Sequence, residues 1–481
     1  MNPPHPRRWL ILAVVLMAEC MDLLDGTVVN VAAPVIHRDL GTSSTGLEWI
    51  VGGYALAVAV GLVTGGRLGD IAGRRRTFLA GVAGFTLASL LCGLAPSTGT
   101  LIAARLLQGA AGALMLPQGL GLLRESFAPG EMAKVFGMFG PVMGLTALLG
   151  PIIGGGLVGL DLLGTGWRLV FLINLPVGLL ALVTGARILP HRAGSPGLSL
   201  DWMGALITCA AGVALVYPLI QGRELGWPAW SFAAMAAGVL GLAGFGVEQR
   251  RRERRGAVPL VTPSVFSHRG YSLGLLTALL FFAAMIGAML TLTLFLQLGQ
   301  GYSALHAALT LIPWSLGAAI GAGAGGGALG PRFGRLVISA GAAVMLAGFA
   351  LVMVAVGGGR VSSWDLAPGL LVSGLGMGLV VAPLFDIILA GVADHELGSG
   401  SGVLNAVQQL AGALGVAVLG TVFFSAVGHG GFAHALHGAL WVALGLLAGV
   451  FVLSFGLPRW ARDPLDLLQP PAAGEPVTVE A

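Results

Sequence analysis

Long apolar stretches alternate with short polar, glycine-rich or proline-rich breaks along the whole chain. A helix that crosses a hydrocarbon core of about 30 Å needs about 20 residues, at a rise of about 1.5 Å per residue. Fourteen stretches of this kind can be delimited: 9–33, 47–67, 77–95, 99–123, 134–159, 167–187, 202–220, 229–247, 272–296, 304–327, 336–356, 366–390, 401–426 and 435–457. The pattern predicts an all-α polytopic membrane protein with 14 transmembrane helices.

Composition excludes the soluble classes of protein. Of the 481 residues 56% are hydrophobic and 10% charged, whereas soluble domains carry about 25% charged residues. The cysteines, Cys20, Cys92 and Cys209, lie inside apolar stretches and do not suggest a disulfide scaffold. The first stretch, from Trp9, is too long for the apolar part of a signal peptide and contains three acids, so we expect it to remain a span.

Basic residues predict the orientation in the membrane. An even number of spans places both termini on one side, and cytoplasmic loops are enriched in Lys and Arg. With the N-terminus inside, 20 of the 25 basic residues are cytoplasmic and four are external. We therefore expect a multi-pass protein of the bacterial cell (inner) membrane with both termini cytoplasmic. The basic run at 248–255 fits a loop that meets anionic lipid better than a nucleic-acid site.

An internal repeat indicates duplicated halves. Residues 66–74 and 327–335 are identical at five of nine positions, and each segment follows the second span of its half. Many transporter folds consist of such repeats. We expect an N-terminal six-helix half (1–190), two inserted transmembrane helices with a basic cytoplasmic loop (191–255), a C-terminal six-helix half (256–460) and a disordered cytoplasmic tail (461–481). Because Pro331 replaces Asp70, the second copy is not expected to repeat every function of the first.

Charges at bilayer depth are costly and mark candidate functional positions. Glu19, Asp22 and Asp25 are spaced i, i+3 and i+6, which places them on one face of the first helix, where they should line a cavity. Arg105 lies at a depth close to that of Asp25, so the two can form a pair that protonation of the acid would release. Glu19, near the midplane without a basic residue at its depth, is expected to load and release protons.

Further polar side chains within the spans are candidates for the cavity. Asn405, Gln408 and Gln409 form a stripe that can face the cavity or join helices, and Asp386 can line the cavity or reach cytoplasmic water. The candidate cavity residues are Asn30, Gln108, Asp386, Asn405 and Gln409.

Cofactor chemistry finds little support in the sequence. Three histidines, His429, His434 and His437, crowd the last outer loop, but a metal site there is the weaker interpretation. No nucleotide-binding loop and no catalytic Ser, His and Asp arrangement stands out. We expect no cofactor, no bound metal and no enzymatic activity.

Five segments together resemble one transporter family. The segments are residues 66–76, the set Arg105, Gln108, Gly109 and Gly112, residues 144–155, residues 24–34 and residues 167–176. They occur in the order found in the major facilitator superfamily and look most like its fourteen-spanner drug:proton antiporter branch, the EmrB/QacA type. The resemblance extends over about residues 9–457.

The resemblance implies a role for each motif. A conformational latch would use Gly66, Gly69, Asp70, Gly73, Arg74 and Arg75. An antiporter motif would use Gly144, Gly150, Pro151, Gly154 and Gly155. Proton coupling is expected to involve Glu19, Asp22, Asp25 and Arg105.

The expected function is proton-coupled efflux of amphipathic, cationic small molecules by alternating access. Drugs, dyes or a self-made antibiotic are examples of such molecules. The partners of the protein are then a small-molecule substrate, protons and the lipid bilayer, with no nucleic acid. A monomer is compatible with the sequence, which leaves the oligomeric state open. The alternatives are a metabolite or siderophore transporter of the same fold, a non-transporting membrane receptor and a lipid-modifying enzyme.

Overall fold

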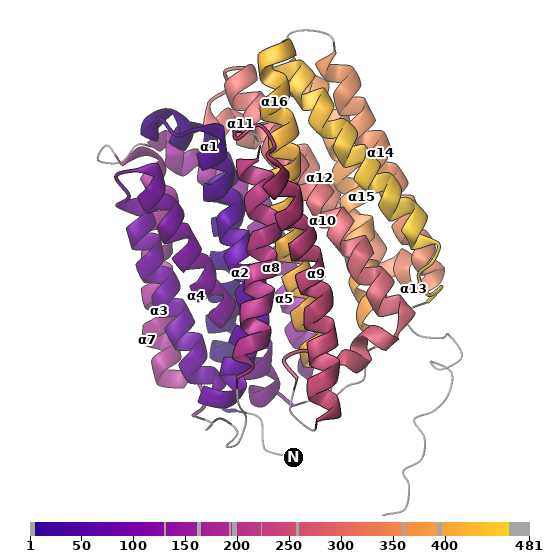
Figure 1. Ribbon diagram of the computed structural model, residues 1–481. Helices are drawn as coiled ribbons and strands as arrows, with labels where there is room; N and C mark the ends of the chain where they lie inside the picture. Colours follow the sequence, from indigo (N-terminus) through magenta and orange to yellow (C-terminus); the bar gives the residue numbers. More distant parts are fainter. Residues whose placement is uncertain are drawn as a thin grey trace, which may run out of the picture.

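The computed structural model describes residues 5–128, 131–160, 165–191, 194, 200–222, 224–255, 259–357, 361–390, 392 and 397–460. These residues form a bundle of long helices without a strand among them (Figure 1). The helices are α1 (Arg8–Leu40), α2 (Ser44–Ala72), α3 (Arg74–Gly93), α4 (Thr98–Ser126), α5 (Met132–Leu160), η3 (Gly166–Arg168), α6 (Leu169–Leu172), α7 (Asn174–Ile188), α8 (Trp202–Gln221), α9 (Ala229–Arg254), η4 (Pro263–Ser267), α10 (Arg269–Leu294), η5 (Phe295–Gly299), α11 (Ala304–Thr310), α12 (Ile312–Gly323), η6 (Ala324–Leu329), α13 (Gly330–Phe333), α14 (Arg335–Val356), α15 (Ser363–Ala390) and α16 (Leu397–Ser454). The expected all-α class is confirmed.

Most of these helices have the length and composition of membrane spans. Eleven segments of the described chain are long and apolar enough to cross a membrane, which makes this a multi-pass membrane protein. Helix α1, which carries the three acids, is not among the eleven, and α16 is counted once although Gly431 breaks its helical geometry. The two last apolar stretches of the sequence fall on either side of Gly431. The count of fourteen crossings stays a prediction.

Contacts between helices form two main groups. In the first, α1 packs on α5 and α7, and α4 packs between α2 and α3. In the second, α10 packs on α16, and α15 packs on α12 and α14. The α8–α9 hairpin lies against the bundle through α8, which contacts α2 of the first group and α16 of the second. The predicted tail (461–481) lies outside the described residues.

A buried polar cluster fixes the hairpin to the chain that enters the second group. The carboxylate of Asp201 caps α8 by accepting from the Gly204 N–H at 2.8 Å, and it also accepts from Gln249 Nε2 at 2.8 Å. Arg252 pairs with the same carboxylate at 3.0 Å. Gln249 Oε1 in turn accepts the backbone N–H of Leu260 at 2.6 Å. Both carboxylate oxygens of Asp201 and both polar atoms of the Gln249 amide have partners, which lowers the cost of burying them.

The two groups touch at the end of the bundle opposite the N-terminus, where α11 lies (Figure 1). A Cβ atom on Gly155 of α5 would come within 2.9 Å of the Ala304 carbonyl oxygen and 2.8 Å of Leu305 Cα, so only glycine allows this approach. Gln297 of η5 donates to the Val31 carbonyl of α1 at 2.8 Å. These contacts close the bundle at that end.

Candidate functional site

A cavity of about 980 Å³ lies between the two groups of helices. Its walls come from α1, α2 and α4 on one side and from α10, α15 and α16 on the other. The lining continues to Arg124 and Ala128, at the end of the bundle where the N-terminal segment bonds to Ser126. Because the opposite end is closed by the α5–α11 contact, the cavity reaches the N-terminal end only.

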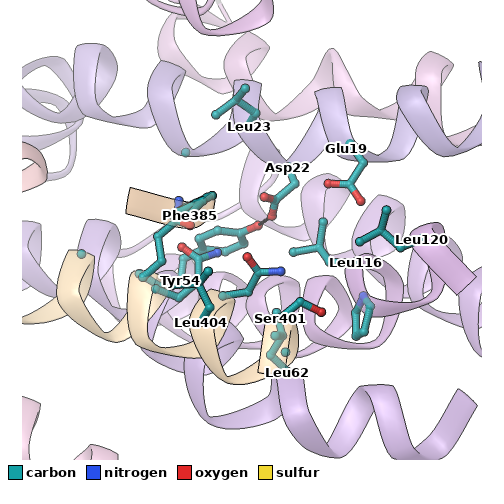
Figure 2. Close-up of a pocket in the computed structure, with 18 of the residues that line it drawn as sticks. Glu19, Asp22, Leu23, Tyr54, Leu62, Leu116, Leu120, Phe385, Ser401 and Leu404 are labelled. Atoms are coloured by element: carbon teal, nitrogen blue, oxygen red, sulfur yellow. Dashed lines mark hydrogen bonds between the residues drawn. The ribbon is translucent and has the colours of Figure 1, made fainter. Parts of the chain in front are cut away.

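The two walls of the cavity differ in chemistry. The wall from the first group carries the acids Glu19 and Asp22 together with Asn30, and Arg105 also borders it. Toward the mouth the same wall adds Arg74, Arg124 and Glu125. The wall from the second group carries the neutral polar side chains Ser401, Asn405, Gln408 and Gln409. Apolar side chains also line the space, among them Leu23, Leu116, Leu120, Phe385 and Leu404, and Figure 2 shows Leu120 beside Glu19. The space suits an amphipathic molecule with polar groups at its edges.

A buried ion pair between Asp25 and Arg105, each 1% exposed, lies next to these acids, and Arg105 of the pair borders the cavity. The contact expected from their matching depths is present. Gln108 Nε2 donates to the Asp25 carboxylate at 2.8 Å and Gln108 Oε1 accepts from Arg105 at 2.7 Å. Asn174 donates to Asp25 at 3.1 Å, and the guanidinium Nε donates to the Ile50 carbonyl at 3.0 Å. Such saturation with partners lets two charges remain buried together.

Tyr54 of α2 joins the cavity to this pair. Its hydroxyl donates to Asp22 in the cavity wall, as Figure 2 shows, and Arg105 lies over its ring at 4.2 Å from the centroid. The hydroxyl therefore contacts a cavity acid, and a face of the ring contacts the buried cation. A single side chain thus touches both Asp22 and Arg105.

The latch loop (residues 66–76) makes a tight turn at the N-terminal end of the bundle. Gly73 has a φ of +92°, which separates α2 from α3 and which other residues rarely adopt. Asp70 does not cap α3; it pairs with Arg74 at 3.1 Å, and Arg74 also pairs with Glu125 of α4 at 3.3 Å. Arg75 points elsewhere, to the Ala186 carbonyl of α7 at 2.6 Å.

The remaining latch and antiporter glycines lie where helices pack closely. A Cβ on Gly69 would collide with Gln118 of α4, and one on Gly66 would touch Pro117. On α5, Gly150 packs on Thr27 and Gly154 on Val28 of α1. Pro151 and Gly144 lie in the same helix. These motifs bring α2 to α4 and α5 to α1, which surround the acids.

The structure corrects three of the sequence-based expectations. Asp25 lies on the same helix as Glu19 and Asp22 but does not line the cavity, because it turns toward Arg105. Gln108 was expected in the cavity but is fully buried in the Asp25 network. Asp386 is exposed and is not part of the lining, although its neighbour Phe385 is.

Sequence reasoning missed four residues around this site. Tyr54, Ser89 and Asn174 bond to the acids or to Gln108. For Tyr54 and Ser89 a single polar residue in an apolar stretch was the only signal, whereas Asn174 lies in the segment 167–176 but was given no role. Glu48 of α2 is 0% exposed and packs against Gly420 of α16. It lies close to the predicted start of its span and was not counted among the charges at depth.

The histidines near the last outer loop bond to the backbone. His429 contacts the Ser425 carbonyl at 3.0 Å and His437 the Met353 carbonyl at 2.8 Å. Within the described part of the chain, no three His, Cys, Asp or Glu side chains are arranged to hold a metal ion.

Known proteins share this fold and much of this sequence. The family profile of the Major Facilitator Superfamily matches residues 15–416. The chain is 50% identical over 428 residues to the "Probable actinorhodin transporter" of Streptomyces coelicolor, covering 89% of this chain and 74% of that protein. It is 40% identical to the "Puromycin resistance protein pur8" of Streptomyces alboniger, covering 87% of this chain and 82% of that protein. For the "Tetracenomycin C resistance and export protein" of Streptomyces glaucescens the identity is 36%, over 88% of this chain and 77% of that protein.

Solved structures agree at the level of the fold. A crystal structure of the POT family transporter PepTSo has a TM-score of 0.69 at 14% identity, covering 94% of this chain and 99% of that chain. The human organic anion transporter MFSD10 has a TM-score of 0.60 at 18% identity, over 94% of this chain and 100% of that chain. The family match identifies a membrane transporter of small molecules and not an enzyme. The chain belongs to the major facilitator superfamily.

Proposed function

We propose that this protein exports amphipathic, cationic small molecules in exchange for protons, by alternating access. Drugs, dyes or a self-made antibiotic are examples of such molecules. The protein would do so as a fourteen-spanner of the EmrB/QacA type in the bacterial cell membrane, with both termini cytoplasmic. Two six-helix halves would rock around the cavity, with α8 and α9 inserted between them. The relatives whose names describe export or resistance support the direction of transport.

One arrangement carries the proposal: Glu19 and Asp22 line the cavity, and Asp25 on the same helix pairs with Arg105 next to them. Arg105 and Asp25 form an ion pair, and Gln108 and Asn174 complete the shell. Protonation of Asp25 would remove the attraction and free the guanidinium. The pair can therefore take two states that differ by one proton.

Glu19 is the acid best placed to exchange a proton for substrate. It lines the cavity, and no described basic group pairs with it. A carboxyl without a paired cation can take up a proton. A cation that enters next to Glu19 favours the carboxylate instead, so substrate binding expels the proton. Asp22 lies one turn from Glu19, and Tyr54 contacts both Asp22 and Arg105. A change of charge at the two cavity acids would therefore reach Arg105 through Tyr54.

The closed contact between α5 and α11 and the cavity mouth at the N-terminal end suit a state that accepts substrate from the cytoplasm. In the opposite state the latch loop would have to rearrange, because Arg74 bridges α2 to Glu125 of α4 at the mouth. The half-exposed ion pairs would stabilise one orientation and break in the other.

The proposal is tested by a dye-quench assay in inside-out vesicles against a broad panel of cationic, neutral and anionic compounds. Addition of a transported cation should dissipate an imposed proton gradient in vesicles with the wild-type protein and not with Asp25→Asn. Transport that persists without any proton gradient would contradict the coupling. Preference for a siderophore or a metabolite in the panel would favour the alternative transporter.

A further inference from the structure

A second, smaller pocket lies outside the transport cavity, at the end of the bundle that carries the N-terminus. It has a volume of about 430 Å³. The basic pocket, as we name it, is formed by the segment before α1 and the end of α7, namely His5, Pro6, Arg7, Arg187, Ile188, Leu189, Pro190 and His191. All four polar side chains in this lining are arginine or histidine. The pocket lies where α1 and α7 leave the apolar part of the bundle.

Arg75 of the latch loop forms part of the surroundings of this pocket. Its guanidinium donates to the Ala186 carbonyl at 2.6 Å and contacts His191 Nε2. Its Nε is buried and has no hydrogen-bond partner among the described residues. A buried N–H without a partner is costly and indicates that an acceptor belongs nearby.

The carboxylates in this region are bound to other arginines. Arg8, next to the pocket in sequence, pairs with Glu131 at 2.9 Å. Arg74, directly before Arg75, pairs with Asp70 at 3.1 Å and with Glu125 at 3.3 Å. The acids are thus paired with Arg8 and Arg74, and not with Arg7 or Arg75 at the pocket.

The arginines in the lining of the basic pocket, and Arg75 next to it, have no counter-charge within the described chain. Arg7, Arg75 and Arg187 form no ion pair with any carboxylate of the described chain. Like charges that converge on a concave surface repel each other and concentrate an anion there. The pocket has the charge of an anion site.

The histidines add hydrogen-bond donors. His5 Nδ1 accepts the Arg7 backbone N–H at 3.2 Å, which leaves the proton of a neutral ring on Nε2. His191 Nε2 faces a guanidinium and so acts as an acceptor, which leaves the proton on Nδ1. Each ring thus keeps one N–H to donate.

The floor of the basic pocket is apolar. Ile188 and Leu189 are 8% and 3% exposed, and two prolines complete the lining. Trp9, the second residue of α1, is 42% exposed, as expected of an aromatic ring at a membrane surface. A free phosphate ion would leave this floor uncovered, whereas a lipid headgroup with the first carbons of its glycerol would cover it.

We propose that the basic pocket binds the phosphodiester of an anionic phospholipid. Arg7, Arg187 and the Arg75 side chain supply charge, and the histidine N–H groups supply donors. An occupied pocket joins the N-terminal segment, the latch loop and α7 through one anion. The lipid thereby holds the latch loop in the arrangement seen here, whichever substrate the cavity accepts.

The test uses the purified full chain and measures lipid binding by native mass spectrometry, with phosphatidylglycerol against phosphatidylcholine of the same acyl chains. Variants Arg7→Gln and Arg187→Gln each remove one pocket charge. Arg255→Gln removes an equal charge from the exposed C-cap of α9, outside the pocket lining, and serves as the matched control. Melting of each variant without lipid shows that it is folded.

We expect phosphatidylglycerol to bind the wild type in preference to phosphatidylcholine. Loss of one arginine near a membrane surface costs about 1 kcal/mol, so each pocket variant should bind roughly fivefold more weakly, with Arg255→Gln unchanged. Equal losses in the control and the pocket variants would show a diffuse charge effect and overturn the site. Inorganic phosphate that displaces the lipid fully at equal concentration would assign the pocket to a free phosphate and also overturn the proposal.

Discussion

The two halves of the bundle carry the same kind of helices but different chemistry. In the first half, the cavity wall and the helices behind it hold Glu19, Asp22, Asp25 and Arg105. In the second half the cavity wall presents amides and a hydroxyl. From this difference we infer that the first half moves the proton and that the second half recognises the substrate.

The repeated loops show the same contrast. Gly73 in the first copy and Gly334 in the second both have positive φ, of +92° and +53°, directly before the arginine that starts the next helix. In the first copy that arginine pairs with Asp70, whereas Arg335 of the second donates to the Phe455 and Leu457 carbonyls at 2.6 and 2.7 Å. Both copies kept the turn that the chain needs. Only the first kept an ion pair that a change of state can break.

The largest loss of transport is expected when the buried Asp25–Arg105 pair is changed. Asp25→Asn or Arg105→Ala leaves one charge buried without a partner, which costs about 3–5 kcal/mol. We expect no transport from either variant and a clear drop in melting temperature. Transport is measured in vesicles and melting in detergent. Asp39→Asn, which removes the partly exposed Asp39–Arg168 pair, should change neither strongly, and wild-type transport by Asp25→Asn would refute the role of the pair.

The next largest effect is expected at the latch loop. Asp70→Asn should reduce transport strongly, because an amide cannot hold Arg74 in an ion pair. The pair has side chains 34% and 37% exposed, so its loss should cost the fold less than about 1 kcal/mol. Transport should therefore fall while the amount of protein in the membrane does not. Asp365→Asn, an exposed acid at the start of α15, is the control, and undiminished transport by Asp70→Asn would reduce the loop to a turn.

The smallest effects are expected on the amide wall. Asn405→Ala and Gln409→Ala each remove hydrogen-bonding groups worth about 1 kcal/mol, so the apparent affinity for a transported dye should change about fivefold. The pH dependence of transport should stay that of the wild type, because no acid is altered. Gln221→Ala, outside the cavity, is the control. A shifted pH profile in the amide variants would contradict the proposal that only the first half takes part in proton movement.

Orientation can be checked independently of transport. The bias of basic residues predicts that the 250–255 loop faces the cytoplasm. A cysteine placed there should react with an impermeant reagent only after the cells are opened. Reaction in intact cells would invert the topology and place the cavity mouth outside.

The sequence predicted what depends on spacing along one helix. Apolar stretches located the helices, and a constant rise per residue matched Asp25 to Arg105 across two of them. Spacing does not say which side of a helix meets which neighbour, so Gln108 and Asp386 were assigned to the cavity wrongly. Tyr54 could not be found this way, because its role depends on the packing of α2 against both α1 and α4.

The central claim is that Glu19 carries the exchanged proton while Asp25 stays paired. A carboxyl loads its proton as the pH falls and releases it as the pH rises or as a cation binds. Proton release on addition of a transported cation, found with the vesicle panel, should be measured in weakly buffered detergent for wild type, Glu19→Gln and Asp25→Asn. The account predicts that Glu19→Gln releases far less and transports poorly with a flattened pH dependence. Unchanged release from Glu19→Gln, together with its loss in Asp25→Asn, would assign the proton to Asp25 and contradict the account.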